Sequence, residues 1–269
     1  MKHIFVFVDF TSTSVLAFDQ ALAIATMKGA GISLCHIAKE LNETSKVEFE
    51  NKLKPFKLKA EEHEVTLEPV ILGGDLFQTA KEVVHRLKPD LIVAGTHGTD
   101  GIHLSLFGSA IHKLVREVSA PTLVIGKECK PMKSGFKKVL LPASVHDYYI
   151  VEVKRACELL VEGGEVILYA IVHPDLPLEQ SVLDNLENAK ALLDERNVSW
   201  NYIEEKAKPH QTGFAVQTLE YMRENEVEMI AISAEVSKRF KLFGKLDKEE
   251  ILLNEDGIMV LCANRTLSQ

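Results

Sequence analysis

The stretch of sequence that decides the fold is DLIVAGTHGTDGIHLSLFGSAIHKLVREV, residues 90–118. It begins with DLIVAG, a short apolar run with β-branched residues, as expected of a buried parallel strand. It ends with SAIHKLVREV, whose apolar residues recur with helical spacing. Gly95 ends the first run, Gly98 and Gly108 follow between the two runs, and Ser109, directly after Gly108, begins the second. The order strand, glycine loop, helix predicts an α/β fold.

The glycines also predict a chemistry for this loop. Glycine lets backbone amides approach an anion without a Cβ in the way, and the start of a helix offers unpaired N–H groups and the positive end of its dipole. Ser109 stands at a natural N-cap position, where its hydroxyl can face a phosphate oxygen instead. The alternative is a surface loop that carries glycines and ends in a helix cap.

The full pattern, G-x2-G-x9-G-S from Gly95 to Ser109, resembles that of the nucleotide-binding universal stress proteins and matches it at every fixed position. The resemblance implies ATP, or a related adenine nucleotide, as the ligand. It also implies that Asp9 serves the nucleoside portion and that Ile37 meets the base through its backbone. The candidate nucleotide-binding residues are Asp9, Ile37, Gly95, His97, Gly98, Gly108, Ser109 and Ala110. Two alternatives stay open: Asp9 as a turn or helix-cap residue, and Ile37 as plain core.

Strands and helices alternate along the chain, which predicts a parallel sheet with helices on both faces. In the first half we expect strands at 2–8, 31–37, 65–71, 91–95 and 121–126, and helices at 13–29, 44–63, 76–87 and 109–118. The same order returns with strands at 137–143, 165–172, 198–203, 229–233 and 257–262. We therefore expect a duplicated chain with domains at 1–128 and 136–269 and a linker at 129–135.

The predicted fold class is α/β, with two tandem open, mostly parallel five-stranded sheets of Rossmann-like, adenine nucleotide alpha hydrolase-like type. Their last strands, 121–126 and 257–262, would otherwise leave open edges, so we expect them to pair and make a pseudo-dimer within one chain. A further homodimer and an unidentified protein partner stay open.

The two halves differ where the nucleotide is expected. Ser233 stands in place of Gly95, Val236 in place of Gly98, and Ser144 in place of Asp9. A β-branched valine resists unusual backbone angles and fills the space that a phosphate needs. The second half is thus expected to be a degenerate copy that serves as a built-in partner.

Composition narrows the function further. The chain has 269 residues, of which 46% are hydrophobic and 26% charged, and a net charge of −8, which argues against a nucleic-acid-binding protein. The sequence begins with a predicted strand and no apolar run approaches ~18 residues, so we expect a cytoplasmic protein without a membrane segment. The four cysteines have no CxxC spacing, so we expect them to be reduced thiols.

Enzyme motifs are absent from the sequence. No Walker A, GxSxG or HExxH pattern occurs, and no general base for an attacking water is evident. His97 and His103 are expected to be solvated, so no metal held by protein ligands is predicted; Mg²⁺ or Mn²⁺ held by the phosphates is the expected form of any cation. These features favour a stress-response binder or sensor without catalytic residues. A slow ATP-hydrolysing enzyme and a non-nucleotide interaction module are the alternatives.

Overall fold

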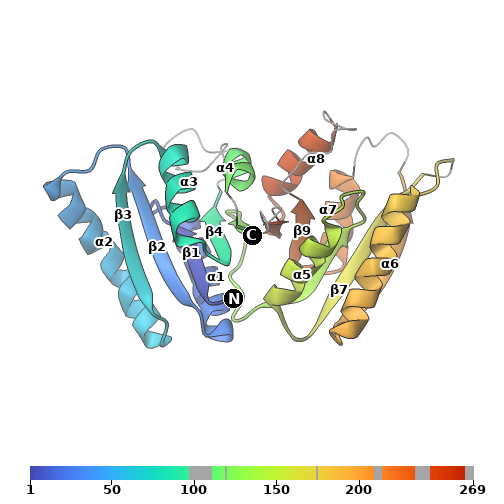
Figure 1. The fold of residues 1–269 in the computed structure, drawn as a ribbon, viewed down its shortest axis with the longest axis horizontal. Coiled ribbons are helices and arrows are strands. Elements are labelled where there is room, and N and C mark those ends of the chain that lie inside the picture. Colours follow the sequence, from blue (N-terminus) through green and yellow to red (C-terminus); the bar gives the residue numbers. More distant parts are fainter. Residues whose placement is uncertain (97–110, 119, 174, 209–213, 234–242, 264–269) are drawn as a thin grey trace.

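The computed structural model describes residues 1–96, 111–118, 120–173, 175–208, 214–233 and 243–263. The described elements alternate between strand and helix along most of the chain (Figure 1). The strands are β1 (His3–Phe7), β2 (Gly31–Ala38), β3 (Leu67–Gly73), β4 (Leu91–Gly95), β5 (Thr122–Ile125), β6 (Phe136–Pro142), β7 (Leu160–Val172), β8 (Ser199–Lys206), β9 (Met229–Ser233) and β10 (Met259–Ala263). The helices are α1 (Ser12–Lys28), α2 (Glu43–Glu62), α3 (Leu76–Leu87), α4 (Ile111–Glu117), α5 (Tyr149–Leu159), α6 (Gln180–Glu195), α7 (Ala215–Glu224) and α8 (Phe243–Leu252).

All these strands join one ten-stranded sheet in the order β3-β2-β1-β4-β5-β10-β9-β6-β7-β8. Within each half every strand pair is parallel, and the order 3-2-1-4-5 of the first half recurs as 8-7-6-9-10 in the second. The predicted α/β class, the parallel halves and the helices on both faces are therefore confirmed.

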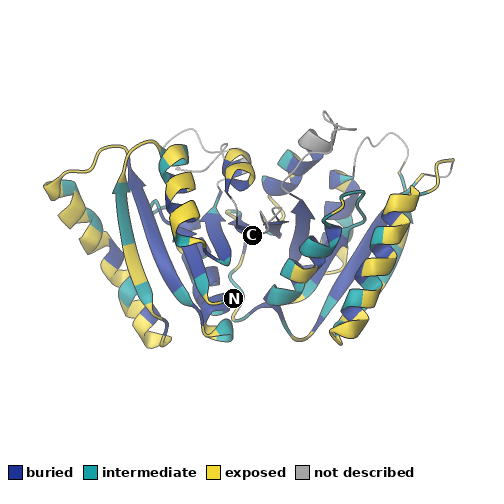
Figure 2. Cartoon of the chain, viewed as in Figure 1, coloured by how far each residue is buried: buried dark blue, intermediate teal, exposed yellow. Residues whose placement is uncertain are grey.

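Two apolar layers sandwich the sheet because side chains alternate along each strand. In β1, Ile4 and Val6 join the layer under α1, α2, α5 and α6, whereas Phe5 and Phe7 join the layer under α3, α4, α7 and α8. Buried residues accordingly fill the central strands, whereas the edge strands β3 and β8 have only intermediate and exposed residues. Exposed residues also lie on the outer faces of the helices (Figure 2). Both halves thus use equivalent helices on equivalent faces.

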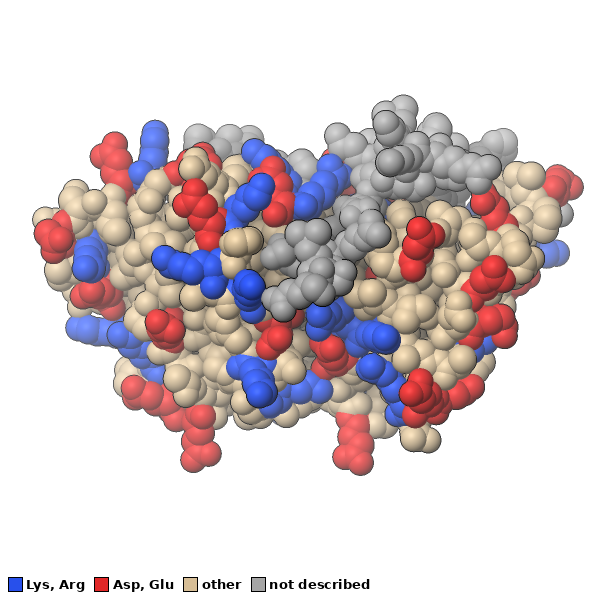
Figure 3. Space-filling view, in the orientation of Figure 1, with Lys and Arg blue, Asp and Glu red and all other residues tan. Residues whose placement is uncertain are grey.

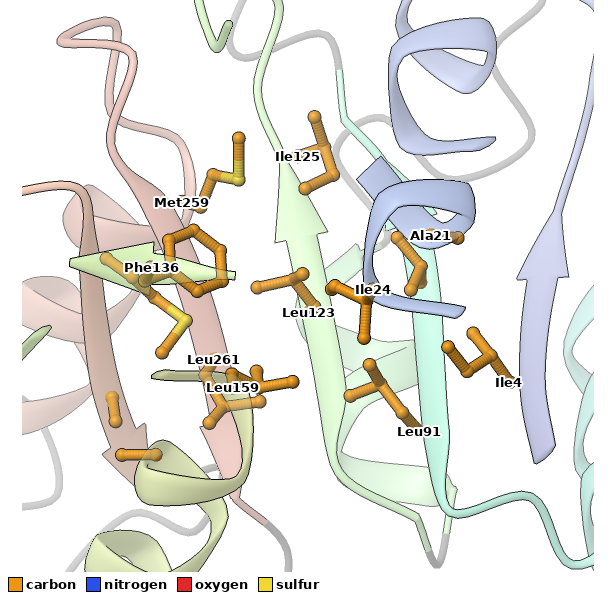
Figure 4. Close-up of a cluster of buried hydrophobic side chains, with 14 of the residues drawn as sticks. Ile4, Ala21, Ile24, Leu91, Leu123, Ile125, Phe136, Leu159, Met259 and Leu261 are labelled. Atoms are coloured by element: carbon orange, nitrogen blue, oxygen red, sulfur yellow. The ribbon is translucent and has the colours of Figure 1, made fainter. Parts of the chain in front are cut away.

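The halves meet through β5 and β10, the one antiparallel pair of strands in the described sheet, with Val124 opposite Val260 and Leu123 opposite Leu261. Apolar side chains close the junction from both sides: Leu123 and Ile24 of the first half face Leu261 and Leu159 of the second (Figure 4). The predicted pairing of the last strands is confirmed, and it makes a single sheet and a continuous core out of the two five-stranded halves.

Helix ends follow their local sequence. Thr11 caps α1 by accepting a hydrogen bond from the backbone N–H of Ser14 at 3.3 Å, and Gly29 ends that helix with a φ of +62°. Asp75 caps α3 by accepting from the N–H groups of Phe77 and Gln78. The largest departure from the expected boundaries is in β7, which begins at Leu160 and not at Glu165. Between these two residues, where Gly163 and Gly164 lie, the pairing of β7 with β6 is irregular.

The segment between the halves is anchored to α1. The buried Gln20 accepts a hydrogen bond from the backbone N–H of Met132 at 2.7 Å and donates to the carbonyl of Ser134 at 3.4 Å.

Lysine and arginine side chains are interspersed with acidic ones on the face shown in Figure 3. No helix in the described ranges is long and apolar enough to cross a membrane.

Candidate functional site

The strand order of the first half reverses at β1, which lies between β2 and β4. In open parallel sheets, ligands bind beyond the carboxyl ends of the strands at such a switch point. Asp9 follows β1 at this edge, and Gly95 is the last residue of β4. The structure therefore brings two of the predicted site residues to the place where this class of sheet forms its crevice.

Asp9 builds the turn between β1 and α1. Its Oδ1 atom accepts hydrogen bonds from the backbone N–H of Thr11 at 3.1 Å and from the Thr11 hydroxyl at 2.5 Å. The Asp9 backbone N–H in turn donates to the Ser14 hydroxyl at 3.3 Å. The turn role that the sequence left open is thus present, and any contact with a nucleoside would be made in addition to it.

Gly95 touches the first turn of α1. A Cβ atom at this position would lie 2.9 Å from the Thr13 carbonyl oxygen and 3.1 Å from the Thr13 Cγ2 atom. Real Cβ atoms essentially never come as close as 2.9 Å to another heavy atom, so glycine allows β4 to end this close to the backbone of α1. The first glycine of the motif therefore has a packing function in the structure, and it draws the end of β4 toward the Asp9 turn.

Ile37 lies in β2 and pairs with Leu72 of β3, with its side chain buried. The ladder between β1 and β2 ends at Phe7 and Cys35, so Ile37 lies beyond the last strand pair with β1. Its side chain belongs to the core, which agrees with the structural alternative; a contact between its backbone and a base stays a prediction.

His36 supports the backbone beside Asp9. Its Nδ1 atom lies 2.8 Å from the Val8 carbonyl oxygen, and because a carbonyl only accepts, Nδ1 donates. Burial lowers the pKa of His36. The neighbouring Phe10 has a φ of +65°, unusual for a bulky residue, and its ring lies 4.7 Å from His36 and 6.1 Å from Phe49.

The other predicted site residues lie outside the described part of the chain. These are His97, Gly98, Gly108, Ser109 and Ala110, together with His103. The structure describes the strand that leads into their loop and α4, which follows it. Their proposed contacts with phosphate therefore stay predictions. Within the described ranges, no group of three or more His, Cys, Asp or Glu gathers as metal ligands.

The equivalent edge of the second half has different chemistry. Ser144, in place of Asp9, accepts from the backbone N–H of His146 at 3.2 Å and so repeats the turn without a carboxylate. Ser233, in place of Gly95, has its hydroxyl 2.5 Å from the Tyr148 hydroxyl. The shape of the turn is kept while the negative charge and the glycine are lost, which accords with the predicted divergence of the halves.

Sequence reasoning missed two features around these edges. The role of His36 had no signal in the sequence, because a histidine within an apolar strand run is indistinguishable from ordinary core. Glu152 of α5 and Lys248 of α8, both buried beside the second crevice, were also missed, because single charges on amphipathic helices usually face solvent.

The four cysteines are free thiols, three of them buried. Burial raises the pKa of Cys35 and of Cys262 to about 12. A thiol of this kind is protonated at neutral pH and unreactive, so these side chains act as core residues.

The parallel halves, their strand order and the helices on both faces define a doubly wound α/β protein. Its first 126 residues match the model of the universal stress protein family. This match identifies the first half of the chain as a universal stress protein domain.

Individual relatives support this assignment. The universal stress protein MJ0531 of Methanocaldococcus jannaschii is 33% identical over 90 residues, which is 34% of this chain and 53% of that protein. The matched region thus spans about half the length of this relative.

Solved structures share the fold over the whole chain. A universal stress protein from Archaeoglobus fulgidus superposes with a TM-score of 0.70 at 15% identity, covering 98% of this chain and 96% of that one. A functionally unknown protein from Pseudomonas aeruginosa PAO1 superposes with a TM-score of 0.65 at 14% identity, covering 99% and 93%. At these identities the likeness concerns the fold alone.

Proposed function

We propose that this protein is a universal stress protein that binds ATP, or a related adenine nucleotide, at the switch point between β1 and β4, as a stress-response binder or sensor. The observation that carries the proposal is the position of the motif. Gly95, its first glycine, ends β4 beside the Asp9 turn, and the remaining glycines lead from that point to α4. A motif of this spacing in a different part of the sheet would have no such meaning.

The proposal assigns parts of the ligand to parts of the chain. Asp9 faces the nucleoside portion and the Ile37 backbone faces the base. The segment 95–110, with His97, Gly98, Gly108, Ser109 and Ala110, surrounds the phosphates with backbone N–H groups and the Ser109 hydroxyl. A Mg²⁺ or Mn²⁺ ion, if bound, is held mainly by phosphate oxygens and water. No described residue is assigned as a general base, so binding is the proposed activity.

We further propose that residues 1–128 and 136–269 are the two domains and that 129–135 is the linker. The second domain then serves as a permanent partner for the first, since β10 covers the β5 edge.

The direct test is mass spectrometry of small molecules carried through purification of the 269-residue chain. The proposal expects an adenine nucleotide, retained by the wild-type protein and lost from Gly98→Val, which copies the residue of the second half. Val236→Gly is the matched control at the corresponding position and should retain the ligand. A folded wild-type protein that neither retains nor binds any adenine nucleotide would overturn the proposal in favour of a non-nucleotide module.

A further inference from the structure

The second half contains a cavity of about 180 Å³ at the edge that corresponds to the proposed nucleotide crevice. It lies where β6 and β9 end, with Pro142 and Ser233 in its wall. Helices α5, α7 and α8 cover this part of the sheet (Figure 1). The cavity therefore occupies the switch point of the second half, the position at which parallel sheets bind ligands.

One wall carries a buried carboxyl group. Glu152 of α5 is 2% exposed and lines the cavity, and its Oε1 atom has no hydrogen-bond partner within the described part of the chain. Leaving a buried polar atom without a partner is unfavourable. A carboxyl held in this way on a cavity wall is the expected arrangement for a group that a ligand completes.

The other charged residue of the cavity is Lys248 of α8, which is 9% exposed. Its charge acts on the Glu152 carboxyl and partly offsets the effect of burial there. A buried lysine and a buried glutamate in one small cavity provide a site for a positive and a negative group of a ligand.

The remaining wall combines polar side chains, such as Ser144 and Thr218, with an apolar part that contains Ile171, Phe214 and Ile232. The volume limits what fits: a cavity of about 150 Å³ holds a benzene molecule in other proteins, and typical drug-sized pockets have about 300–1,000 Å³. A molecule of roughly ten non-hydrogen atoms matches this volume. The ligand is thus a small molecule that carries one positive group, one negative group and an apolar part.

We infer that the second half binds a small apolar α-amino acid in this cavity. Its carboxylate pairs with the Lys248 ammonium group, its ammonium group donates to Glu152 Oε1, and its side chain packs against Ile171, Phe214 and Ile232. This inference does not depend on nucleotide binding by the first half.

Titration calorimetry of the 269-residue chain with L-leucine as the probe tests this assignment. Glu152→Gln and Lys248→Met should each weaken leucine binding at least tenfold. Glu158→Gln, on the same helix but paired with Arg155 at 3.0 Å, is the matched control and should bind as the wild type does. The analogues 4-methylpentanoate, which lacks the amine, and 3-methylbutylamine, which lacks the carboxylate, should also bind at least tenfold more weakly.

A second readout separates recognition by Glu152 from a merely structural effect. Burial raises the pKa of Glu152 to about 8, so the empty site is mostly protonated at pH 7. An ammonium group beside it favours the carboxylate, and binding should release close to one proton per leucine, seen as a binding enthalpy that depends on the buffer. The other titratable groups that face Glu152 or the cavity are Lys248, Tyr149, Cys262, His146 and Tyr169.

The outcomes decide the inference plainly. Proton release in the wild type that is absent in a folded Glu152→Gln variant supports it. Three results would overturn it: no leucine binding by a folded wild type, equal binding by Glu152→Gln, or 4-methylpentanoate binding as tightly as leucine.

Discussion

Gly95→Ala should destabilise the protein because the added methyl group has no room. The new Cβ would lie 2.9 Å from the carbonyl oxygen and 3.0 Å from the carbonyl carbon of Thr13, and these backbone atoms cannot rotate away as a flexible side chain would. Overpacking of this kind costs about 1–3 kcal/mol. The strain falls on the first turn of α1, to which Asp9 is bonded through Thr11 and Ser14.

The assay is thermal and urea unfolding of the full chain, with Gly31→Ala as the matched control. A Cβ at Gly31 would lie 3.6 Å from the Thr66 carbonyl oxygen, an ordinary contact, so this variant should be neutral or gain about 0.4–1 kcal/mol from reduced entropy of the unfolded chain. Each kcal/mol lost in Gly95→Ala should lower Tm by roughly 2–4 °C. If Gly95→Ala is as stable as Gly31→Ala, the packing explanation for the first motif glycine is wrong.

Three other perturbations separate the parts of the account. Asp9→Ala should weaken ATP binding about tenfold and pyrophosphate binding less, while Asp9→Asn should keep the turn because it retains Oδ1; equal losses for both ligands would limit Asp9 to a structural role. The carbonyls of Pro121 and Ile125 accept hydrogen bonds from the N–H groups of Ile92 and Thr96, so by alternation along β5 the Val124 N–H points to β10. Val124→Pro removes this donor and should lower the free energy of unfolding by about 1–3 kcal/mol and loosen the contact between the two halves. An unchanged unfolding transition would count against this junction. Burial raises the pKa of Glu152 to about 8, against the opposing charge of Lys248, so the folded state holds a proton that the unfolded state loses above a pKa of 4.5. Stability should therefore fall as the pH rises between these two pKa values, by up to about 1.4 kcal/mol per pH unit. Glu152→Gln should reduce this dependence of stability on pH. A variant whose stability changes with pH as that of the wild type does would disprove the raised pKa of Glu152.

Much of the fold was predictable because local pattern and global topology agree. Apolar runs such as 91–95 and 229–233 became strands with the expected bounds, and the repeated order of elements predicted both the parallel halves and the pairing of β5 with β10. The site was predictable only as positions on the sheet edge. Two features of the site depend on distances between segments that are far apart in the sequence, which no local pattern encodes. Gly95 contacts the backbone of Thr13, and the buried Glu152 has no partner for its Oε1 atom in the described part of the chain.

The most direct test of the central claim is the number of nucleotides bound per chain. Isothermal titration of the nucleotide-free, 269-residue chain with ATP should give one site per chain, because only the first half combines the Asp9 turn with Gly95, Gly98, Gly108 and Ser109. Gly98→Val should abolish that site and leave the protein folded. Two equivalent sites per chain, or one site that survives in Gly98→Val, would contradict the account.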